Sequence, residues 1–552
     1  MGLACGQRLT HPSLLGSCLS SGPFSGIASE RAVLFRALAG ELGGTGLRGR
    51  LSAADPWDLI RVMPAKGVRI VATTVERGTV AEHGLSEQWG IEPVPVEKRT
   101  LSGLDLAVLW GDLGIGLLVL VTGALLVPAL GFGVAMVAIV LGSLIGVGLL
   151  ASGAAAGARH GIPTMVLLRP VLGVRGSWLP TAFNVIQLVG WTAVELWAMS
   201  YVADIVSERV FGFSARWLWL SIAGIVCCGL ALWGPVGVTR VWMERFGVWV
   251  IGGISVLVTI AVLTSDGIVS AIAAPGAGGF PTFGPALDLV IAMPVSWFPL
   301  VADYTRFGAR PRSAFAGTFF GYLIANVWLY ALGALLVLAG TTTPDPAGIA
   351  IGLLAIAGGS VVGILFLIGL LVGETDEAFA DIYSGAVSLQ NLLPRVPQKA
   401  LIVGITLVGA GLAALLTMQL YESFLFLIGS VFVPLMGVVI ADHFVIRRGR
   451  LEVGELYERR GRYWFGGGVR WQALVPWVAG FLAYHWISPS PVDWWMRLTT
   501  GLLGDPLSVQ FSWLSASIPS FLVALVLGLV VLRDISSESL DEPATHQQRG
   551  DR

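Results

Sequence analysis

Long apolar stretches follow one another through most of the chain, from about residue 104 to residue 533. Most of them approach the roughly 20 residues that a helix needs to cross a bilayer. This pattern predicts an all-α integral membrane protein with twelve transmembrane helices. We also expect a small additional helix within 347–390, ahead of the eighth span. The apolar segments lie at about 104–130, 132–156, 177–203, 217–235, 243–264, 284–302, 313–340, 360–390, 399–417, 420–445, 472–487 and 510–533.

Charge is scarce along this chain and unevenly placed. The 552 residues include 34 Lys and Arg and 35 Asp and Glu, so that 12% are charged; soluble domains carry about 25%. This excludes a soluble protein, and the net charge of −1 gives no reason to expect a nucleic-acid partner. Outside the two polar tails, 20 Lys and Arg fall on one side of the twelve spans and 3 on the other. The positive-inside rule therefore predicts a multi-pass protein of the cytoplasmic membrane with both termini in the cytoplasm.

The two ends of the chain are polar. Residues 1–95 contain no run long enough to span a bilayer and no convincing signal peptide, so we interpret them as a cytoplasmic tail or an extension upstream of the true start. The ten-span core is expected at 96–445, followed by a basic cytoplasmic loop at 446–471 and two further spans within 472–533. Residues 534–552 are expected to form a disordered tail.

Carboxylates, in contrast to the basic residues, fall inside the apolar region. A carboxylate in a bilayer core costs several kcal/mol unless it is protonated, hydrated or paired with a cation or a donor-rich substrate. Asp288 is expected at a helix end that faces water, whereas Glu195 lies near the middle of its span. The acids within or beside predicted spans are Asp112, Glu195, Asp288, Glu374, Asp376, Glu377 and Asp381.

Two spans carry residues that interrupt helices. Span one contains three glycines and an aspartate within 111–116, and span six contains Pro294 and Pro299. These positions correspond if spans one to five and six to ten are inverted repeats. Matching breaks in two halves are the best sequence indication of a transporter's substrate site. We therefore expect a five-plus-five inverted-repeat core.

Span three places Gln187, Trp191 and Glu195 on one helix face, because they are four residues apart. Trp191 is too deep for the interfacial belt of aromatic residues. A deep indole beside a carboxylate suits a flat heteroaromatic ring: the indole stacks on it, and the carboxylate accepts its N–H groups. Packing between helices is the alternative reading.

Span eight carries the most polar stretch of the apolar region, at 373–384. Hydroxyl, carboxylate and carbonyl oxygens are the ligands that hard cations such as Na⁺ accept. A carboxylate in this stretch could instead carry a proton, and a solvated helix end is the remaining alternative.

Several of these segments together resemble the nucleobase–cation symporter-1 family, which includes cytosine/purine permeases and transporters of hydantoins and hydroxymethylpyrimidine. The resemblance covers about residues 90–535 and implies the leucine-transporter type of inverted-repeat fold, with broken helices 1 and 6 and two additional C-terminal helices. The motifs that carry it are Gly111-Asp112-Leu113-Gly114, Gln187-Leu188-Val189-Gly190-Trp191-Thr192-Ala193, Ser296-Trp297-Phe298-Pro299, Asp303-Tyr304-Thr305-Arg306 and Asp381-Ile382-Tyr383-Ser384-Gly385-Ala386.

The resemblance also implies roles for particular residues. In the hydantoin transporter of that family, a span-three and a span-six tryptophan hold the ring, and Trp191 and Trp297 match those places. A glutamine there is replaced by Glu195 here, which favours a substrate edge rich in N–H donors. Span eight of that transporter has Ser-Thr for sodium and Asn for the substrate, and 374–376 takes their place with Glu, Thr and Asp. Coupling to Na⁺ and coupling to H⁺ therefore both stay open.

The sequence predicts a secondary transporter that imports a nucleobase or a related pyrimidine together with Na⁺ or H⁺, and that works as a monomer with no other cofactor. Alternatives within the same fold are a symporter for hydantoin or allantoin and one for amino acids or amines. A receptor or an integral membrane enzyme is disfavoured, because no nucleophile motif or nucleotide-binding loop occurs. The predicted substrate-binding residues are Gln187, Trp191, Glu195, Ser296, Trp297, Asp112, Asp376 and Asp381, and the predicted cation-binding residues are Gly111, Gly114, Glu374 and Thr375.

Overall fold

The computed structural model describes residues 89–234, 248–340, 343–357, 361–488 and 492–533. The predictions for most of the N-terminal tail and for the C-terminal tail lie outside these residues.

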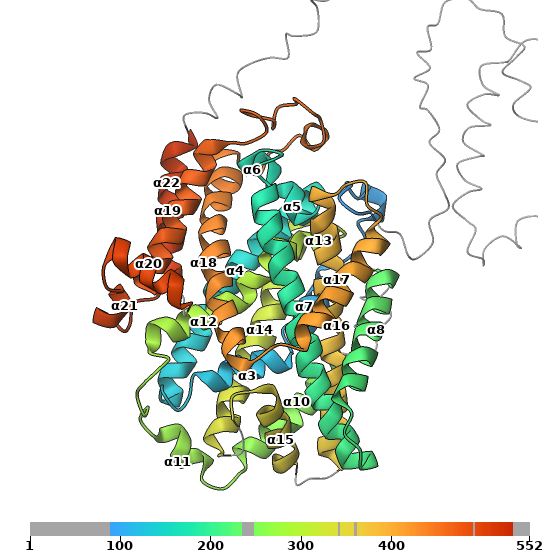
Figure 1. Cartoon of the computed structure of the whole chain (residues 1–552), viewed down its shortest axis with the longest axis vertical. Coiled ribbons are helices and arrows are strands. Elements are labelled where there is room, and N and C mark those ends of the chain that lie inside the picture. The colour runs from blue at the N-terminus through green and yellow to red at the C-terminus, as the bar shows by residue number, and fades with distance from the viewer. Residues whose placement is uncertain (1–88, 235–247, 341–342, 358–360, 489–491, 534–552) are drawn as a thin grey trace, which may run out of the picture. The chain divides into compact units, whose positions relative to one another are not determined.

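The described residues form helices joined by short connections, and every predicted apolar segment coincides with helix (Figure 1). By length and apolar composition, six helices in the described ranges can cross a membrane, or seven if α2 and α3 form one bent span. The other segments are shorter or rich in acids, so the twelve-span count stays a prediction. The main helices are α2 (Gly103–Asp112), α3 (Leu117–Leu125), α4 (Phe132–His160), α7 (Trp178–Phe211), α8 (Arg216–Trp233), α10 (Val248–Leu263), α12 (Phe283–Ser296), α14 (Pro311–Leu338), α16 (Val361–Leu392), α17 (Gln398–Ala413), α18 (Met418–Val439), α19 (Trp471–Ile487) and α22 (Ser517–Val531).

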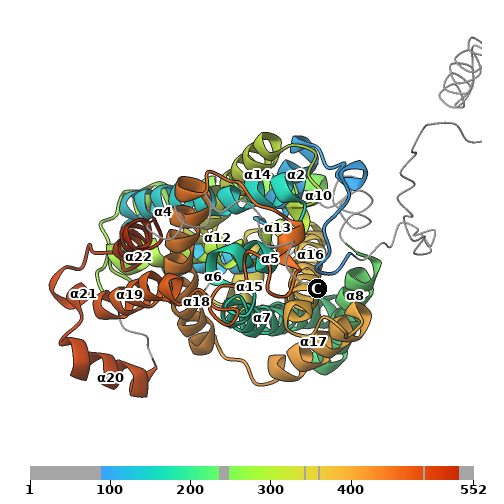
Figure 2. The same ribbon diagram turned by 90° about the horizontal axis from the view of Figure 1, so that it is seen from above.

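Shorter elements connect the main helices. The small helix expected before the eighth span is present as α15 (Pro346–Ile356). Figure 2 shows α18, α19 and α22 gathered on one side and α8 and α17 on the other, with α20 and α21 at the outside. The remaining short elements are η2 (Val96–Lys98), α5 (Thr164–Leu167), α6 (Arg169–Leu172), α11 (Ile268–Ala273), η4 (Phe298–Leu300), α13 (Val301–Thr305), η5 (Ile440–Ile446), η6 (Gly454–Leu456), α20 (Asp493–Leu503) and α21 (Leu507–Gln510).

The helix irregularities expected in spans one and six differ in kind. The axes of α2 and α3 meet at 60° across residues 113–116. In span six, α12 continues through Pro294 and ends at Ser296, where the chain passes through the 3₁₀ turn η4 into α13. Residues 283–305 still qualify as a single apolar span. The relation of the two sites by an inverted repeat stays a prediction.

Glycines let α14 lie directly against both halves of span one. A Cβ atom at Gly321 would collide with the carbonyl oxygen of Ala107 in α2, and one at Gly333 with that of Leu120 in α3. From the other side, a Cβ at Gly123 would collide with the carbonyl oxygen of Tyr330. Small residues of this kind are the usual means of close helix packing in membranes. They hold the bent α2–α3 pair against one long helix.

Asp288 does not lie at a water-facing helix end, as the sequence suggested. Its side chain is fully buried. Its carboxylate accepts hydrogen bonds from the Ser515 hydroxyl at 2.6 Å and from the backbone N–H groups of Ala516 and Ser517 at 2.8 and 2.9 Å. These donors lie at the start of α22, where free N–H groups and the helix dipole favour a negative charge. The prediction was wrong because it could not foresee this partner 228 residues away.

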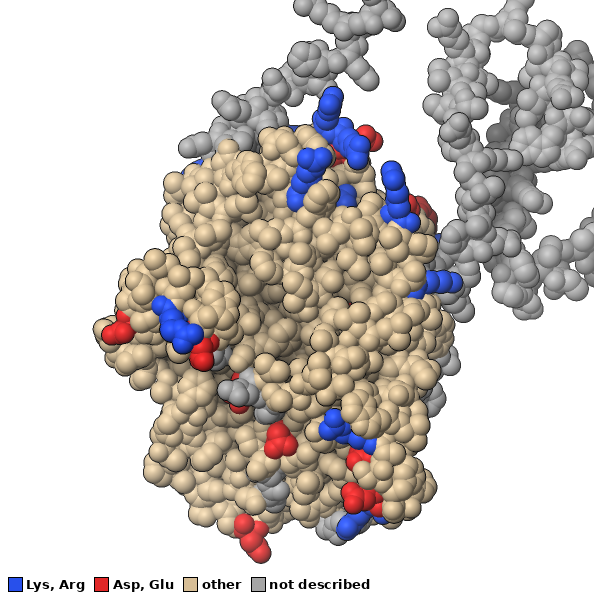
Figure 3. All heavy atoms as spheres, in the orientation of Figure 1, with Lys and Arg blue, Asp and Glu red and all other residues tan. Residues whose placement is uncertain are grey.

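The 446–471 loop folds onto one end of the bundle. The Asp442 carboxylate forms an ion pair with the Nε atom of Arg447 at 2.7 Å and a second one with the buried Arg470. Arg169 in α6 donates to the Asn391 side chain at 2.6 Å and to the Leu456 carbonyl oxygen in the loop at 2.9 Å. Lys and Arg gather at this end of the molecule (Figure 3). Some of the basic residues at this end are therefore packed between elements of the fold, and others lie in loops.

We predict that Gly123→Ala destabilises the protein, because the added methyl group would meet the backbone of Tyr330. Overpacking of this kind costs about 1–3 kcal/mol, so the melting temperature of the purified protein should fall by several degrees. Gly133→Ala is the matched control, since nothing lies within 4 Å of a Cβ at that position. Equal melting temperatures for the two variants would contradict this account of the helix contact.

Candidate functional site

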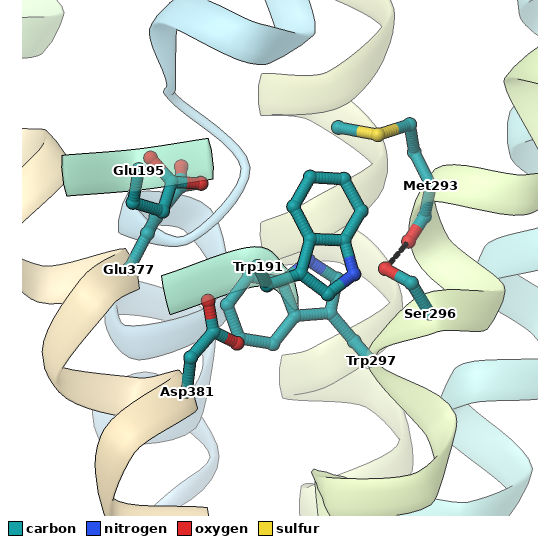
Figure 4. Close-up of a pocket in the computed structure, with 7 residues that line it drawn as sticks. All are labelled: Trp191, Glu195, Met293, Ser296, Trp297, Glu377 and Asp381. Carbon is teal, nitrogen blue, oxygen red and sulfur yellow. Dashed lines mark hydrogen bonds between the residues drawn. The ribbon is translucent and has the colours of Figure 1, made fainter. Parts of the chain in front are cut away.

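A buried pocket between α7, α12 and α16 brings together five of the residues predicted to bind substrate. The indoles of Trp191 and Trp297 lie between acidic side chains on one side and Ser296 on the other (Figure 4). Helix α7 supplies a tryptophan and a glutamate because these residues are four apart and share a face. The pocket is lined by Trp191, Glu195, Met293, Ser296, Trp297, Glu377 and Asp381.

The pocket is closed in this conformation. Its volume is about 10 Å³, which is room for about one water molecule. A heteroaromatic ring cannot enter unless the side chains around it move apart. The conformation that binds a ligand must therefore differ from this one by a separation of the helices or of the two indoles.

Aromatic neighbours hold both indoles in place. Trp191 packs edge to face with Phe424 at a centroid distance of 5.3 Å and with Tyr421 at 6.1 Å. Trp297 packs edge to face with Trp110 from α2 at 6.0 Å. The Nε1 atom of Trp191 is buried without a hydrogen-bond partner. A buried donor without a partner is uncommon and is available to a ligand.

Gln187 does not line the pocket; it fastens α7 to the end of α12. Its Nε2 atom donates to the backbone carbonyl oxygen of Ser296 at 2.8 Å and to Asn184 Oδ1 at 2.9 Å. The Ser296 hydroxyl donates to the Met293 carbonyl oxygen at 2.6 Å. These bonds satisfy carbonyl groups at the turn that precedes Trp297. Gln187 therefore positions the end of α12, which supplies Ser296 and Trp297 to the pocket.

Glu195 lies in a cluster of three buried glutamates. Its carboxyl group lies against those of Glu374 and Glu377 from α16. Glu374 also accepts a hydrogen bond from the backbone N–H of Leu117, the first residue of α3. Glu377 packs directly against Gly116, where a Cβ atom would overlap its carboxyl group. The positive end of the α3 dipole is thus directed at these acids.

Asp112 and Asp376 form a second carboxyl pair, away from the pocket lining. The two side chains are in contact, and all four of their oxygens are buried without a donor. Two carboxylates in contact cannot both stay ionised in a medium of low dielectric constant. One shared proton would turn the contact into a hydrogen bond. The sequence predicts that both residues bind the substrate, and this stays a prediction; in this structure they lie against each other, outside the pocket lining.

The structure places the residues predicted to bind a cation in α2, in the bend that follows it and in α16. The Thr375 hydroxyl is half-buried and donates to the Val372 carbonyl oxygen of its own helix at 2.5 Å. Gly111 faces Gly321 and Gly114 faces Ala325, both in α14. The role of these residues in cation binding stays a prediction. Across the described ranges, no three His, Cys, Asp or Glu side chains come together in a way that could hold a metal ion.

Two pocket residues, Met293 and Glu377, were not among the predicted site residues. Met293 precedes Ser296 and Trp297 by three and four positions, which places all three on one helix face. Glu377 lies between Glu374 and Asp381 at the same helical spacing. The helical periodicity of α12 and α16 could therefore have indicated both residues. Which face turned inward could only be decided by the neighbouring helices.

Comparisons with known proteins relate this chain to a family of permeases. A family model described as "Permease for cytosine/purines, uracil, thiamine, allantoin" matches residues 93–504. The allantoin permease of Bacillus subtilis (strain 168) is 27% identical over 426 residues, covering 71% of this chain and 85% of that protein. The hydantoin permease of Microbacterium maritypicum is 26% identical over 452 residues, covering 78% and 89%.

A solved structure shows the same fold. Mhp1, a nucleobase-cation-symport-1 family transporter in a closed conformation with bromovinylhydantoin bound, matches with a TM-score of 0.69 and 21% identity. The match covers 82% of this chain and 97% of that one.

We predict that Gln187→Leu weakens ligand binding without loss of folded protein. The change leaves the Ser296 carbonyl oxygen without its side-chain donor, and an unsatisfied buried acceptor costs about 1–3 kcal/mol. Affinity measured by quenching of tryptophan fluorescence should fall about tenfold or more. Gln472→Leu, the same change at an exposed position of α19, is the control; equal affinities in both variants would refute the positioning role.

Proposed function

Because this chain belongs to the family of permeases for cytosine/purines, uracil, thiamine and allantoin, we propose that it imports a nucleobase or a related pyrimidine across the cytoplasmic membrane. Family membership confirms the resemblance found in the sequence, and the chain is a multi-pass membrane transporter rather than an enzyme. We also propose that the chain works as a monomer. Both of its termini would lie in the cytoplasm.

One observation carries the choice of substrate: two indoles and three carboxyl groups line the same buried pocket, with no basic side chain among the lining residues. Indole faces suit a flat ring, and carboxylates suit an edge of N–H donors. Trp191 and Trp297 would enclose the ring, while Glu195 and Asp381 would accept hydrogen bonds from its amino edge. A cytosine-like or hydroxymethylpyrimidine-like ring has such an edge.

A hydantoin or allantoin is the second candidate, supported by the relatives that carry those names. Their rings present several carbonyl oxygens, which ionised carboxylates would repel. An amino acid or amine of small aliphatic shape fits two facing indoles less well. The amino-edged pyrimidine therefore remains the first candidate.

We propose that a proton drives import, with Na⁺ as the alternative. The support is the contact of Glu195 with Glu374 and Glu377, together with the Asp112–Asp376 pair, none of which has an ion-pair partner among the described Lys and Arg residues. Buried acids without basic partners hold protons. Substrate that binds to Glu195 needs an ionised oxygen there, so it would move the shared proton within the glutamate cluster.

We predict that Trp191→Ala abolishes uptake of radiolabelled cytosine, because the ring loses one stacking face. The amount of protein in the membrane should stay normal. Trp217→Ala, at a position 62% exposed at the start of α8, should leave uptake unchanged. Unimpaired uptake by Trp191→Ala would refute stacking. If no nucleobase, hydantoin or thiamine precursor is accumulated or stabilises the wild-type chain in a thermal-shift panel, the proposed function is wrong.

We predict that Glu374→Gln separates binding from accumulation. Glutamine can still accept the N–H of Leu117, but it cannot release a proton. In proteoliposomes, a pH gradient should drive substrate uptake by the wild-type chain and not by Glu374→Gln, while exchange of internal for external substrate persists. Glu208→Gln, at an exposed position near the end of α7, is the control. Uptake that follows a Na⁺ gradient and ignores the pH gradient would contradict proton coupling.

A further inference from the structure

The pocket gathers three carboxyl groups and no basic side chain. Glu195, Glu377 and Asp381 line it, and Glu374 lies directly behind Glu195. The Oε2 atom of Glu195 and the Oε1 atom of Glu377 are buried without a donor. These acids come from two helices, α7 and α16, and no arginine or lysine lines the cavity. Charge of one sign in a water-poor site is stable only with protons or with a ligand of the opposite charge.

The aromatic lining is an independent indication of the same ligand charge. Trp191 and Trp297 both line the cavity, and indole is the ring whose face attracts a cation most strongly. Phe424 packs edge to face against Trp191, and Trp110 packs in the same way against Trp297. In Figure 4 the carboxyl group of Asp381 points toward the indoles, and Glu195 and Glu377 lie together beside them. Carboxylates next to aromatic faces form an environment that recognises an organic cation.

A neutral nucleobase uses this environment poorly. Cytosine and uracil offer N–H donors, but cytosine also has one carbonyl oxygen and uracil has two, and a carboxylate repels such oxygens. An amino-substituted ring with a delocalised positive charge has donors and charge on the same edge and no carbonyl oxygen to place against a carboxylate. Among the lining residues, the Nε1 atom of Trp191 is buried without a partner and could donate to an acceptor on the ligand.

We propose that the preferred substrate is a heteroaromatic cation with an amino edge, such as a protonated or quaternised aminopyrimidine or aminopyridine. This inference rests on the proposed function, because it uses the same pocket. Asp381 and Glu195 bind the amino edge and balance the charge, and Trp191 and Trp297 cover the ring faces. Glu374 and Glu377 remain free to hold the coupling proton, so one cluster accommodates both positive charges.

The test compares two molecules of the same shape that differ in charge. The permanent cation 4-amino-1-methylpyridinium and the neutral 4-methylaniline are titrated into the purified full-length chain, with cytosine and uracil as neutral nucleobases. Quenching of tryptophan fluorescence gives each Kd. Because this cation keeps its charge at every pH, its Kd reports the charged form alone. We expect the cation to bind at least about tenfold more tightly than its neutral counterpart.

Substitutions then assign the preference to the acids. Asp381→Asn and Glu195→Gln should each reduce the preference for the cation to about threefold or less, by weakening binding of the cation and not of 4-methylaniline. Retained binding of the neutral molecule shows that the variants are folded. Asp266→Asn, an exposed acid between α10 and α11, should keep the full preference.

The possible failures are distinct. If cytosine or 4-methylaniline binds as tightly as the cation, the inference is overturned while the proposed import of a nucleobase stands. If the preference for the cation survives both substitutions, the assignment to Asp381 and Glu195 is overturned. If no heterocycle in the panel binds, the inference and the proposed function both fall.

Discussion

The organisation of this transporter depends on carboxyl groups that are buried without basic partners. Basic residues such as Arg169 and Arg470 lie instead at the end of the bundle where the 446–471 loop packs. Glu195, Glu374 and Glu377 meet in the interior, and Asp112 meets Asp376. A low dielectric makes such charge costly. The site is therefore stable only when it holds protons or positive charge, which is the physical argument for the proposed coupling.

The bend between α2 and α3 and the acids of α16 belong to one arrangement. The bend leaves the N-terminal N–H groups of α3 without helical acceptors, and Glu374 accepts one of them from Leu117. Gly116 has no side chain, so Glu377 can lie against the backbone there. The glycines at 123 and 333 in turn let α3 lie close to α14. Movement of this half-helix would change the surroundings of both glutamates, which links the pocket to the conformation of the bundle.

Much of the site could be predicted from sequence because helical spacing is a local property. Trp191 and Glu195 share a face of α7, and Trp297 follows Ser296 at the end of α12, so the residues that line the pocket were mostly found in advance. Met293 and Glu377 were missed, although the same periodicity includes them. Thr375 lies beside Glu374 in sequence, but its hydroxyl donates to the Val372 carbonyl oxygen of its own helix, and its role in cation binding stays a prediction. Adjacent residues on a helix point in different directions, and sequence alone does not say which face turns inward.

The sequence by itself determined that this is a helical membrane protein, that its basic residues lie outside the spans, and which helices carry acids and deep tryptophans. These properties follow from composition and short-range periodicity. Only the tertiary structure decided which acid meets which. Asp288 caps α22, 228 residues further along the chain, Asp112 lies against Asp376 of α16, and Gln187 donates to the end of α12. Such partners are set by long-range packing between helices, because a buried polar group must find its donor or its proton wherever the fold places one.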